Sequence, residues 1–450
     1  MKKSLVIFFS LCTVIMAETN VVQRFPKPQF ETPYVQPEPT MPAPRSLFQE
    51  YADVIVLFAA LSLASFAALK MRSRKTIFLL MILSLLYFGF WREGCVCPVG
   101  SLQNIALALS DSSYAIPVTV LLFFMLPVIF TLFFGRTFCA AVCPLGAIQD
   151  LVVIKPMRMS GWLSATLGLF PYIYLSFAVL FAATGAGFII CRYDPFVGLF
   201  RFGASFKMFL LAACILIIGF AVARPYCRFI CPYGVILNWM SIFSQRHLTI
   251  TPDECIRCRL CEESCPFDAI KIPAAEPILP DLAKNRVRLL WLLILTPVVI
   301  VLSAWAGSRS SFVLSRVHPS VRLAERIQLE DAHQVQDTTL ESRTFRSSGK
   351  PTEQLYDEVS HIRSRIKTGA VFVSAFIALV FMLKLMRLMR YQRVADYEPD
   401  QGQCLSCGRC FSYCPLEHVR LGLISRESLG PDVQKPAIQQ GVVPDSRDTE

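Results

Sequence analysis

Long apolar runs separated by short polar stretches make up most of this chain of 450 residues. A membrane-spanning helix needs about 20 mostly apolar residues, and seven of the runs approach that length. They cover residues 52–69, 76–92, 115–134, 163–190, 207–223, 287–306 and 369–386. The pattern predicts a mainly α-helical protein, a polytopic transmembrane bundle of about seven spans. The hydrophobic content of 54% is also high for a soluble domain of this size.

Basic residues gather at alternate ends of the predicted spans and indicate how the chain is threaded. They follow the first, third, fifth and seventh spans, and they include Lys70, Arg72, Arg74, Lys75, Arg136, Lys155, Arg158, Arg224, Arg228, Lys284, Arg286, Arg288, Lys384, Arg387, Arg390 and Arg393. By the positive-inside rule this face is cytoplasmic. We therefore expect a multi-pass protein of the bacterial cytoplasmic (inner) membrane, embedded in the lipid bilayer. The net charge of +11 then gives no reason to expect nucleic acid as a partner.

The regions outside the spans suggest a division of the chain. Residues 1–17 carry two lysines, an apolar core and a terminal alanine, which is typical of a signal peptide or a short anchor. The predicted organisation is 1–17 signal peptide or anchor, 18–50 Pro-rich periplasmic segment, 51–245 transmembrane core, 246–285 first cytoplasmic ferredoxin motif, 286–306 transmembrane span, 307–367 periplasmic loop, 368–390 transmembrane span, 391–420 second cytoplasmic ferredoxin motif and 421–450 flexible tail.

Two motifs of the form C-x2-C-x2-C-x3-C-P carry the clearest chemistry. They are CIRCRLCEESCP, with Cys255, Cys258, Cys261 and Cys265, and CLSCGRCFSYCP, with Cys404, Cys407, Cys410 and Cys414. This is the bacterial run for a [4Fe-4S] cluster, since three closely spaced thiolates wrap a cube within one tight loop and the fourth follows a turn. Zinc is the alternative, although four cysteines this close followed by Pro are unusual for a zinc site. The motifs predict two [4Fe-4S] clusters.

The two motifs offer two possible pairings of their cysteines. In two-cluster ferredoxins the fourth cysteine of each motif ligates the other cluster. If both segments fold as one cytoplasmic ferredoxin-like α+β module, Cys414 joins the first three cysteines of the first motif, and Cys265 joins those of the second. Two membrane spans would split such a module in sequence. Two separate single-cluster domains are the alternative.

Two shorter motifs, CAAVCPLG and CRFICPYG, lie at the cytoplasmic ends of predicted spans. They supply Cys139, Cys143, Cys227 and Cys231. Two thiolates do not complete a cluster site, so we expect the four to share one site, which would hold a third iron–sulfur cluster. Each motif Pro stands at an expected first helical position, where backbone N–H groups and the helix dipole favour an anionic cluster. Two thiol pairs that stay reduced are the alternative.

Two related motifs, CVCPVG and CRYDPFVG, fall on the predicted outer face. They supply Cys95, Cys97 and Cys191, with Asp194 near the place of a second cysteine. The same pairing predicts a fourth iron–sulfur cluster at the outer face, with Asp194 as its fourth ligand. The alternatives are an outward-facing redox pair of Cys95 and Cys97 in the oxidising periplasm and an Asp194 that only caps the turn before Pro195.

Taken together, FGRTFCAAVCPLGAIQ, ARPYCRFICPYG and CIRCRLCEESCPFDAI resemble the NosR/NapH-type membrane polyferredoxins, which also include the CcoG-like proteins. The resemblance covers residues 76–270 and the motif at 404–415. It implies membrane-bound electron transfer between a quinol or cytosolic donor and a periplasmic acceptor system. This chain departs from the pattern because two spans separate its ferredoxin motifs and because a periplasmic flavin domain of the NosR type is not recognisable in it.

The function expected from these patterns is a relay of single electrons across the membrane. The chain would be the electron-transfer component of an oxidoreductase system rather than a stand-alone enzyme. It would connect a cytoplasmic or quinol donor with a periplasmic flavoprotein or cytochrome. The five histidines lie outside the predicted spans and C-x-x-C-H does not occur, which argues against haem. The alternatives are a maturation factor for a periplasmic or membrane metalloenzyme, resembling the CcoG branch, and an iron–sulfur redox sensor.

Overall fold

The computed structural model describes residues 46–94, 97–154, 156–203, 205–250, 255–273, 282–335, 337–389, 396–425 and 428. The first half contains α2 (Leu47–Phe66) with its π-helical extension η1 (Ala67–Met71), α3 (Arg74–Ser84) with its extension η2 (Leu85–Trp91), α4 (Pro98–Ser110), α5 (Val118–Phe134), α6 (Thr137–Ala141), α7 (Pro144–Leu151), α8 (Gly161–Leu167), α9 (Phe170–Ala183), α10 (Ile189–Tyr193), α11 (Pro195–Phe200) and α12 (Phe206–Gly219).

The second half contains α13 (Pro225–Phe229), α14 (Pro232–Ile242), α15 (Leu260–Ser264), β1 (Ile270–Lys271), α16 (Leu282–Ser315), α17 (Pro319–Asp331), α18 (Leu340–Ser347), α19 (Thr352–Met389), β2 (Glu398–Pro399), α20 (Arg409–Ser412) and α21 (Pro415–Arg420). The chain is mainly helical, as the apolar periodicity predicts. Side chains of many helices share one core, in which Leu61, Phe196 and Leu237 are fully buried.

Five helical segments are long and apolar enough to cross a membrane by length and composition. They are Leu47–Met71, Arg74–Trp91, Gly161–Ala183, Arg286–Ser315 and Thr352–Arg387. The third and fifth predicted spans form shorter apolar helices, α5 with 17 residues and α12 with 14. Pro117 caps the start of α5 and Gly135, with a φ of 72°, ends it, so this helix is shorter than its apolar run. Crossing by these two helices therefore stays a prediction.

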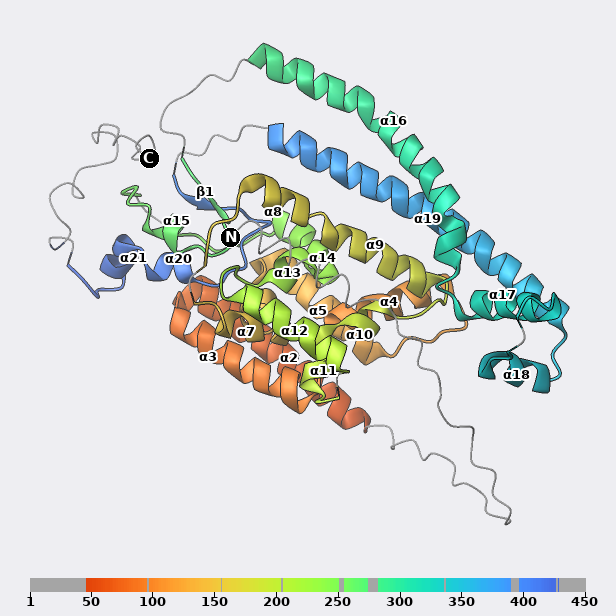
Figure 1. Ribbon diagram of the computed structural model, residues 1–450. Helices are drawn as coiled ribbons and strands as arrows, with labels where there is room; N and C mark the ends of the chain where they lie inside the picture. The colour runs from red at the N-terminus through yellow and green to blue at the C-terminus, as the bar shows by residue number, and fades with distance from the viewer. Residues whose placement is uncertain are drawn as a thin grey trace.

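The long helices α16 and α19 run side by side along one flank of the molecule, next to α9 (Figure 1). Their close approach depends on small residues, as in many membrane helix pairs. A Cβ on Gly307 would overlap the Ser374 hydroxyl. The Ser303 hydroxyl donates to the Ser374 carbonyl at 2.8 Å. Helix α19 begins well before its predicted span, because the charged residues 352–368 continue the same helix.

The ferredoxin segments and the polar segment 307–367 lie at opposite ends of the long helices (Figure 1). Strands β1 and β2 pair antiparallel, with Ile270 opposite Pro399 and Lys271 opposite Glu398. They join the exit of the first motif to the entrance of the second. At the other end, residues predicted only as a polar loop form α17 and α18. Helix α4, between the second and third predicted spans, is a further element that was not predicted.

Candidate iron–sulfur sites

The two ferredoxin loops share one backbone conformation. Arg257 and Arg259 in the first loop have φ values of 53° and 64°, and Ser406 and Gly408 occupy the same positions in the second with 53° and 75°. Such left-handed residues are uncommon outside glycine, but they turn neighbouring N–H groups into anion-binding concavities that are found at many Fe–S sites. A Cβ at position 408 would come within 2.6 Å of the Phe411 ring, so glycine also avoids a steric overlap there.

Each loop borders a small cavity, and each cavity takes cysteines from both motifs. One is lined by Cys255, Cys258, Cys261 and Cys414, and the other by Cys404, Cys407, Cys410 and Cys265. We call them ferredoxin site A and ferredoxin site B. The structure thus brings together the two sets that the crossed pairing requires, although α16 and α19 separate them in sequence. Iron ligation by these residues stays a prediction.

The spacing of the candidate ligands also bears on the choice between zinc and a cluster. Among the residues that the structure describes, no three His, Cys, Asp or Glu side chains converge closely enough to hold one metal ion. A tetrahedral zinc needs such convergence, because its Zn–S bonds are about 2.3 Å long. A four-iron cube holds its thiolates at separate corners, so this finding does not count against a cluster in sites A and B.

The four cysteines of the two shorter motifs lie together and form what we call the inner site. The pKa of Cys143 is raised by burial and then by the neighbouring Cys227, Cys139 and Cys231. Burial also raises the pKa of Cys227 to about 12, although Arg224 opposes this rise. A buried thiol loses its proton only where a nearby cation offsets the cost of burial and the repulsion by neighbouring thiolates. The iron of a cluster supplies such a cation. The donor set therefore fits an iron–sulfur cluster.

The inner motifs also have the predicted local structure. Pro144 and Pro232 are the first residues of α7 and α14, and Cys143 and Cys231 are the N-cap residues. Proline fits there because its missing N–H has no partner in the first turn. The free N–H groups and positive dipole ends of both helices begin beside the cysteine cluster, which favours negative charge there.

Two buried arginines link the inner site to its surroundings, and neither is a predicted site residue. Each precedes the first cysteine of its motif by three positions. Arg224 is fully buried and donates to the carbonyls of Cys139 and, at 3.3 Å, Ala140. Arg136 lies 3.8 Å from the Cys139 sulfur and donates to the Gly402 carbonyl at 3.2 Å. The repeated spacing R-x2-C-x3-C-P is a sequence signal for them.

Asp150 ties the inner site to ferredoxin site B. Its carboxylate pairs with Arg74, Arg224 and Arg409 at 3.3, 3.4 and 3.4 Å. Burial opposes ionisation, but the three guanidinium groups lower the pKa of Asp150 to about 2. Arg74 also donates to the Cys407 carbonyl at 2.7 Å. One buried carboxylate of α7 thus holds side chains from α3, the second inner motif and the second ferredoxin loop.

Three of the four predicted outer ligands lie together, and we call this group the outer site. A Cβ on Gly100 would come within 3.2 Å of the Cys191 sulfur. The pKa of Cys97 is raised to about 12 by burial, then by the nearby Asp194. Cys95, the fourth predicted ligand, lies outside the described residues.

Asp194 is the N-cap residue of α11 and is buried. Its Oδ1 accepts the N–H groups of Phe196 and Val197 at 2.9 and 3.3 Å, and its Oδ2 accepts the Tyr226 hydroxyl at 3.0 Å. The structure therefore contains the capping hydrogen bonds that the alternative interpretation of Asp194 expects. Iron ligation by Asp194 stays a prediction. Because Tyr226 directly precedes Cys227 in sequence, this hydrogen bond connects the outer site to the inner site.

Comparison with known proteins points to the same cofactor. Two family models, each described as a 4Fe-4S binding domain, match residues 116–158 with 205–251 and residues 248–271. These ranges contain both inner motifs and the first ferredoxin motif. The matches support an iron–sulfur-binding protein. The chain is also similar to the uncharacterized protein MJ0749 of Methanocaldococcus jannaschii, with 41% identity over 64 residues, which cover 14% of this chain and 26% of that protein. No solved structure matches.

This iron–sulfur-binding protein places its sites close to one another. Ala223, Phe267, Leu405 and Cys407 form a small hydrophobic cluster that also contacts Cys139, Cys265 and Cys404. Residues of the inner site and of ferredoxin site B therefore pack against the same apolar side chains.

Proposed function

We propose that this chain is a membrane-bound iron–sulfur electron-transfer protein that relays electrons across the cytoplasmic membrane. The observation that carries the proposal is the grouping of cysteines from distant segments around two ferredoxin-type cavities. Positive φ values at equivalent positions of both loops add support. A bound iron–sulfur cluster supplies one-electron oxidation and reduction there.

The arrangement of the candidate sites supports a relay rather than isolated centres. Sites A and B share cysteines of both ferredoxin motifs, and site B and the inner site share one hydrophobic cluster. Tyr226 then joins the inner site to the outer site through its hydrogen bond to Asp194. In Figure 1, α15 and α20 lie at one end of the long helices, and α10 and α11 lie further along toward α17 and α18.

The proposed partners follow from this direction through the molecule. A cytoplasmic or quinol donor would serve the ferredoxin end, and a periplasmic flavoprotein or cytochrome would serve the outer end. The basic residues near the ferredoxin end support a cytoplasmic position for it under the positive-inside rule. Residues 307–367, with α17 and α18, would then face the periplasm.

The first test counts iron and acid-labile sulfide per chain in anaerobically purified protein, with EPR spectra recorded during stepwise reduction. Sites A and B and the inner site predict about 12 irons, and a cluster in the outer site adds about two to four. About eight irons would remove the inner site from the proposal. Stoichiometric zinc without sulfide would overturn the proposal as a whole.

A second test asks whether electrons cross the membrane. The protein is reconstituted in sealed vesicles that contain an impermeant electron acceptor, and an impermeant reductant is added outside. We expect acceptor reduction that depends on the protein and that is lost when Cys227 and Cys231 are both replaced by Ala. An equal rate without the protein, or with that variant, would contradict the relay and favour a redox sensor.

A further inference from the structure

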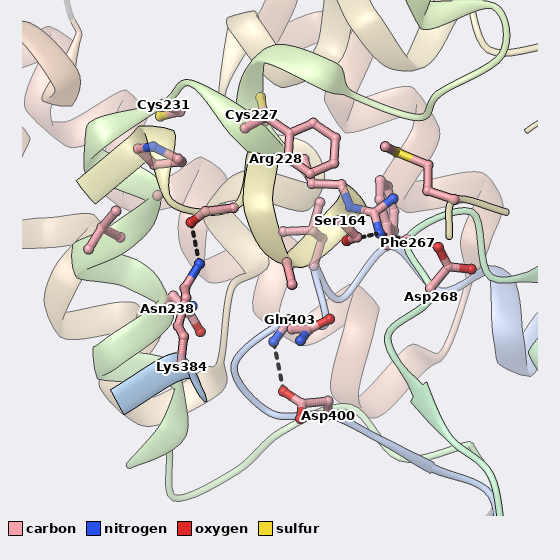
Figure 2. Close-up of a pocket in the computed structure, with 18 of the residues that line it drawn as sticks. Ser164, Cys227, Arg228, Cys231, Asn238, Phe267, Asp268, Lys384, Asp400 and Gln403 are labelled. Carbon is pink, nitrogen blue, oxygen red and sulfur yellow. Dashed lines mark hydrogen bonds and ion pairs between the residues drawn. The ribbon is translucent and has the colours of Figure 1, made fainter. Parts of the chain in front are cut away.

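A cavity of about 600 Å³ lies beside the inner site, at the ferredoxin end of α19 (Figure 2). This volume is within the range of pockets that hold small organic ligands. Side chains of α8, α9, α13, α14 and α19 line it, together with the two ferredoxin segments. In Figure 2, Cys227 and Cys231 border one end, and Lys384 and Asp400 lie at the other. Much of the lining is therefore separate from the four-cysteine site.

The lining carries more positive than negative charge. Its two carboxylates, Asp268 and Asp400, are paired with Arg228 and Arg387 at 3.2 and 3.0 Å. Within the described part of the chain, no carboxylate forms an ion pair with the other basic lining residues, Arg136, Lys271 and Lys384. The Nε of Arg136 is also buried and lacks a hydrogen-bond partner among the described atoms. Because Arg136 also lies 3.8 Å from the Cys139 sulfur of the inner site, Lys271 and Lys384 are the cations that an anion in the cavity would balance.

Lys384 marks the end of the cavity that lies against the candidate spans. Its ammonium group donates to the Gly168 carbonyl and lies 4.9 Å from the centroid of the Tyr172 ring. A lysine with an apolar stem along a helix and its charge at the membrane boundary is a common arrangement. The ammonium group donates to a single carbonyl among the described residues, and Arg387 is a like charge nearby, so Lys384 keeps donor capacity for an anionic oxygen.

An apolar wall continues from this basic end between the helices. The rings of Tyr172 in α9 and Trp239 in α14 are 6.0 Å apart, and Trp239 lies 6.2 Å from Phe376 in α19. Both α9 and α19 belong to candidate membrane spans. Tyr172 lines the cavity next to its cations, and the rings of Trp239 and Phe376 continue from Tyr172 outside the cavity lining. Basic pockets between spans on the cytoplasmic side are typical binding sites for anionic lipid head groups.

We propose that this cavity binds the phosphate head group of an anionic phospholipid, with Lys384 as a principal contact and the acyl chains along the aromatic wall. The proposal rests on the membrane placement within the proposed function, and it does not require electron transfer. A free phosphate compound offers the same anionic oxygens but has nothing to place against Tyr172, Trp239 and Phe376.

The test measures bound lipid on the full-length, cluster-loaded protein. Delipidated protein is placed in mixed micelles with phosphatidylglycerol or phosphatidylcholine, and lipid per chain is determined by native mass spectrometry. We expect selective binding of phosphatidylglycerol, weakened about fivefold by Lys384→Gln, in line with the contribution of one basic residue near an anionic surface. Lys384→Arg keeps the charge and should keep binding. Lys367→Gln, in the same helix just before the predicted span 369–386, is the matched control and should bind normally.

Each outcome bears on the proposal. Equal binding of the two lipids, or unchanged binding by Lys384→Gln, would overturn it. Inorganic phosphate at millimolar concentration is a further arm, and displacement of the lipid by phosphate alone would assign the cavity to a soluble phosphate compound. Iron content is measured on the same samples. Loss of lipid binding with iron unchanged would therefore separate this proposal from the proposed electron transfer.

Discussion

Asp194 shows at the residue scale how a capping role and a ligand role can be separated. Asparagine keeps an oxygen for the N–H groups of Phe196 and Val197 and an amide group that can face Tyr226, and it is as good an N-cap as aspartate. We therefore expect Asp194→Asn to unfold at nearly the wild-type temperature. We expect Asp194→Ala to lose about 1–2 kcal/mol, because the cap is lost and the buried Tyr226 hydroxyl loses its partner.

The measurements for Asp194 are thermal unfolding in detergent and the EPR spectrum of the reduced protein. If Asp194 acts only as a cap, Asp194→Asn leaves every EPR signal unchanged, and this is the result that the three hydrogen bonds lead us to expect. A signal that disappears in Asp194→Asn while the fold is retained would make Asp194 an iron ligand. Cys97→Ser is the matched variant that identifies the signal of the outer site.

Asp150 is a second residue whose replacement should have a large effect. Asp150→Asn keeps the size of the side chain but leaves the fully buried Arg224 without its counter-charge. Removal of one partner from a buried pair costs about 3–5 kcal/mol, so we expect a much lower unfolding temperature. Because the pKa of Asp150 is lowered to about 2, its contribution is present above the ordinary carboxyl pKa of 3.8 and is lost as the pH falls toward 2.

Glu325 provides the control for Asp150. It pairs with Arg316 at 3.1 Å and with Arg363 at 3.0 Å, but 53% and 40% of these two arginine side chains are exposed, and such surface pairs contribute about 0–1 kcal/mol each. Glu325→Gln should therefore unfold close to the wild-type temperature. Similar losses for Asp150→Asn and Glu325→Gln would mean that the Asp150 contacts do not stabilise the fold.

The residues that hold the sites differ in how well the sequence predicts them. Cysteine spacing predicts which cysteines belong to the two ferredoxin motifs and the two inner motifs, because ligand spacing is a local property. Arg224 and Asp150 are a different case, since each is defined by partners more than 70 positions away. Their burial follows from the packing of α3, α7 and α13, which no single stretch of sequence contains.

At the scale of elements, α17 offers a test with a defined dependence on pH. His318 is its N-cap residue, and Nδ1 accepts the Ser320 N–H at 3.2 Å. Burial lowers the pKa of His318, although Glu358 opposes this. The neutral ring is therefore the form that stabilises the fold, and protonation removes the acceptor. The contribution is present above the unfolded pKa of about 6.5 and is lost as the pH falls below it.

We expect the first turn of α17 to become less protected from hydrogen exchange when the pH falls from about 7.5 to about 5.5, after correction for intrinsic exchange rates. His318→Asn supplies a cap that does not titrate, so its α17 should keep the same protection at both values. Equal behaviour of the wild type and His318→Asn across this range would show that the histidine cap does not control the helix start.

The elements also show where apolar periodicity stops being informative. It places a helix in each of the seven apolar runs within the described residues, and the sequence DEVSHIRSRIK predicts a helix that runs into the seventh span. It does not predict that α5 and α12 are shorter than their runs or that α19 starts as early as Thr352. Pro117, Gly135 and the charged start of α19 set these boundaries through local backbone preferences. Helix α4 was not predicted because its 13 residues fall below membrane length, although it packs against α5 and α9.

At the scale of the whole molecule, two long helices separate the halves of the ferredoxin module in sequence, and the β1–β2 pair joins them in space. The motif alone leaves two arrangements open, because the fourth cysteine of each motif can ligate the cluster of its own motif or the cluster of the other motif. The structure favours crossing, since Cys414 and Cys265 line the cavities of the opposite motifs. This arrangement makes the α16–α19 hairpin a structural requirement of both sites, in addition to any membrane anchoring.

The crossed arrangement can be tested by removing one site and asking which fourth cysteine the other site needs. With Cys404, Cys407 and Cys410 replaced by Ala, we expect one ferredoxin-type cluster to remain, held by Cys255, Cys258, Cys261 and Cys414. Adding Cys414→Ser to this variant should remove or alter its EPR signal, because a cube that loses one thiolate loses the hold on one iron. Adding Cys265→Ser should leave the signal unchanged, because site B is already absent. The opposite pattern would mean that each motif forms its own cluster domain.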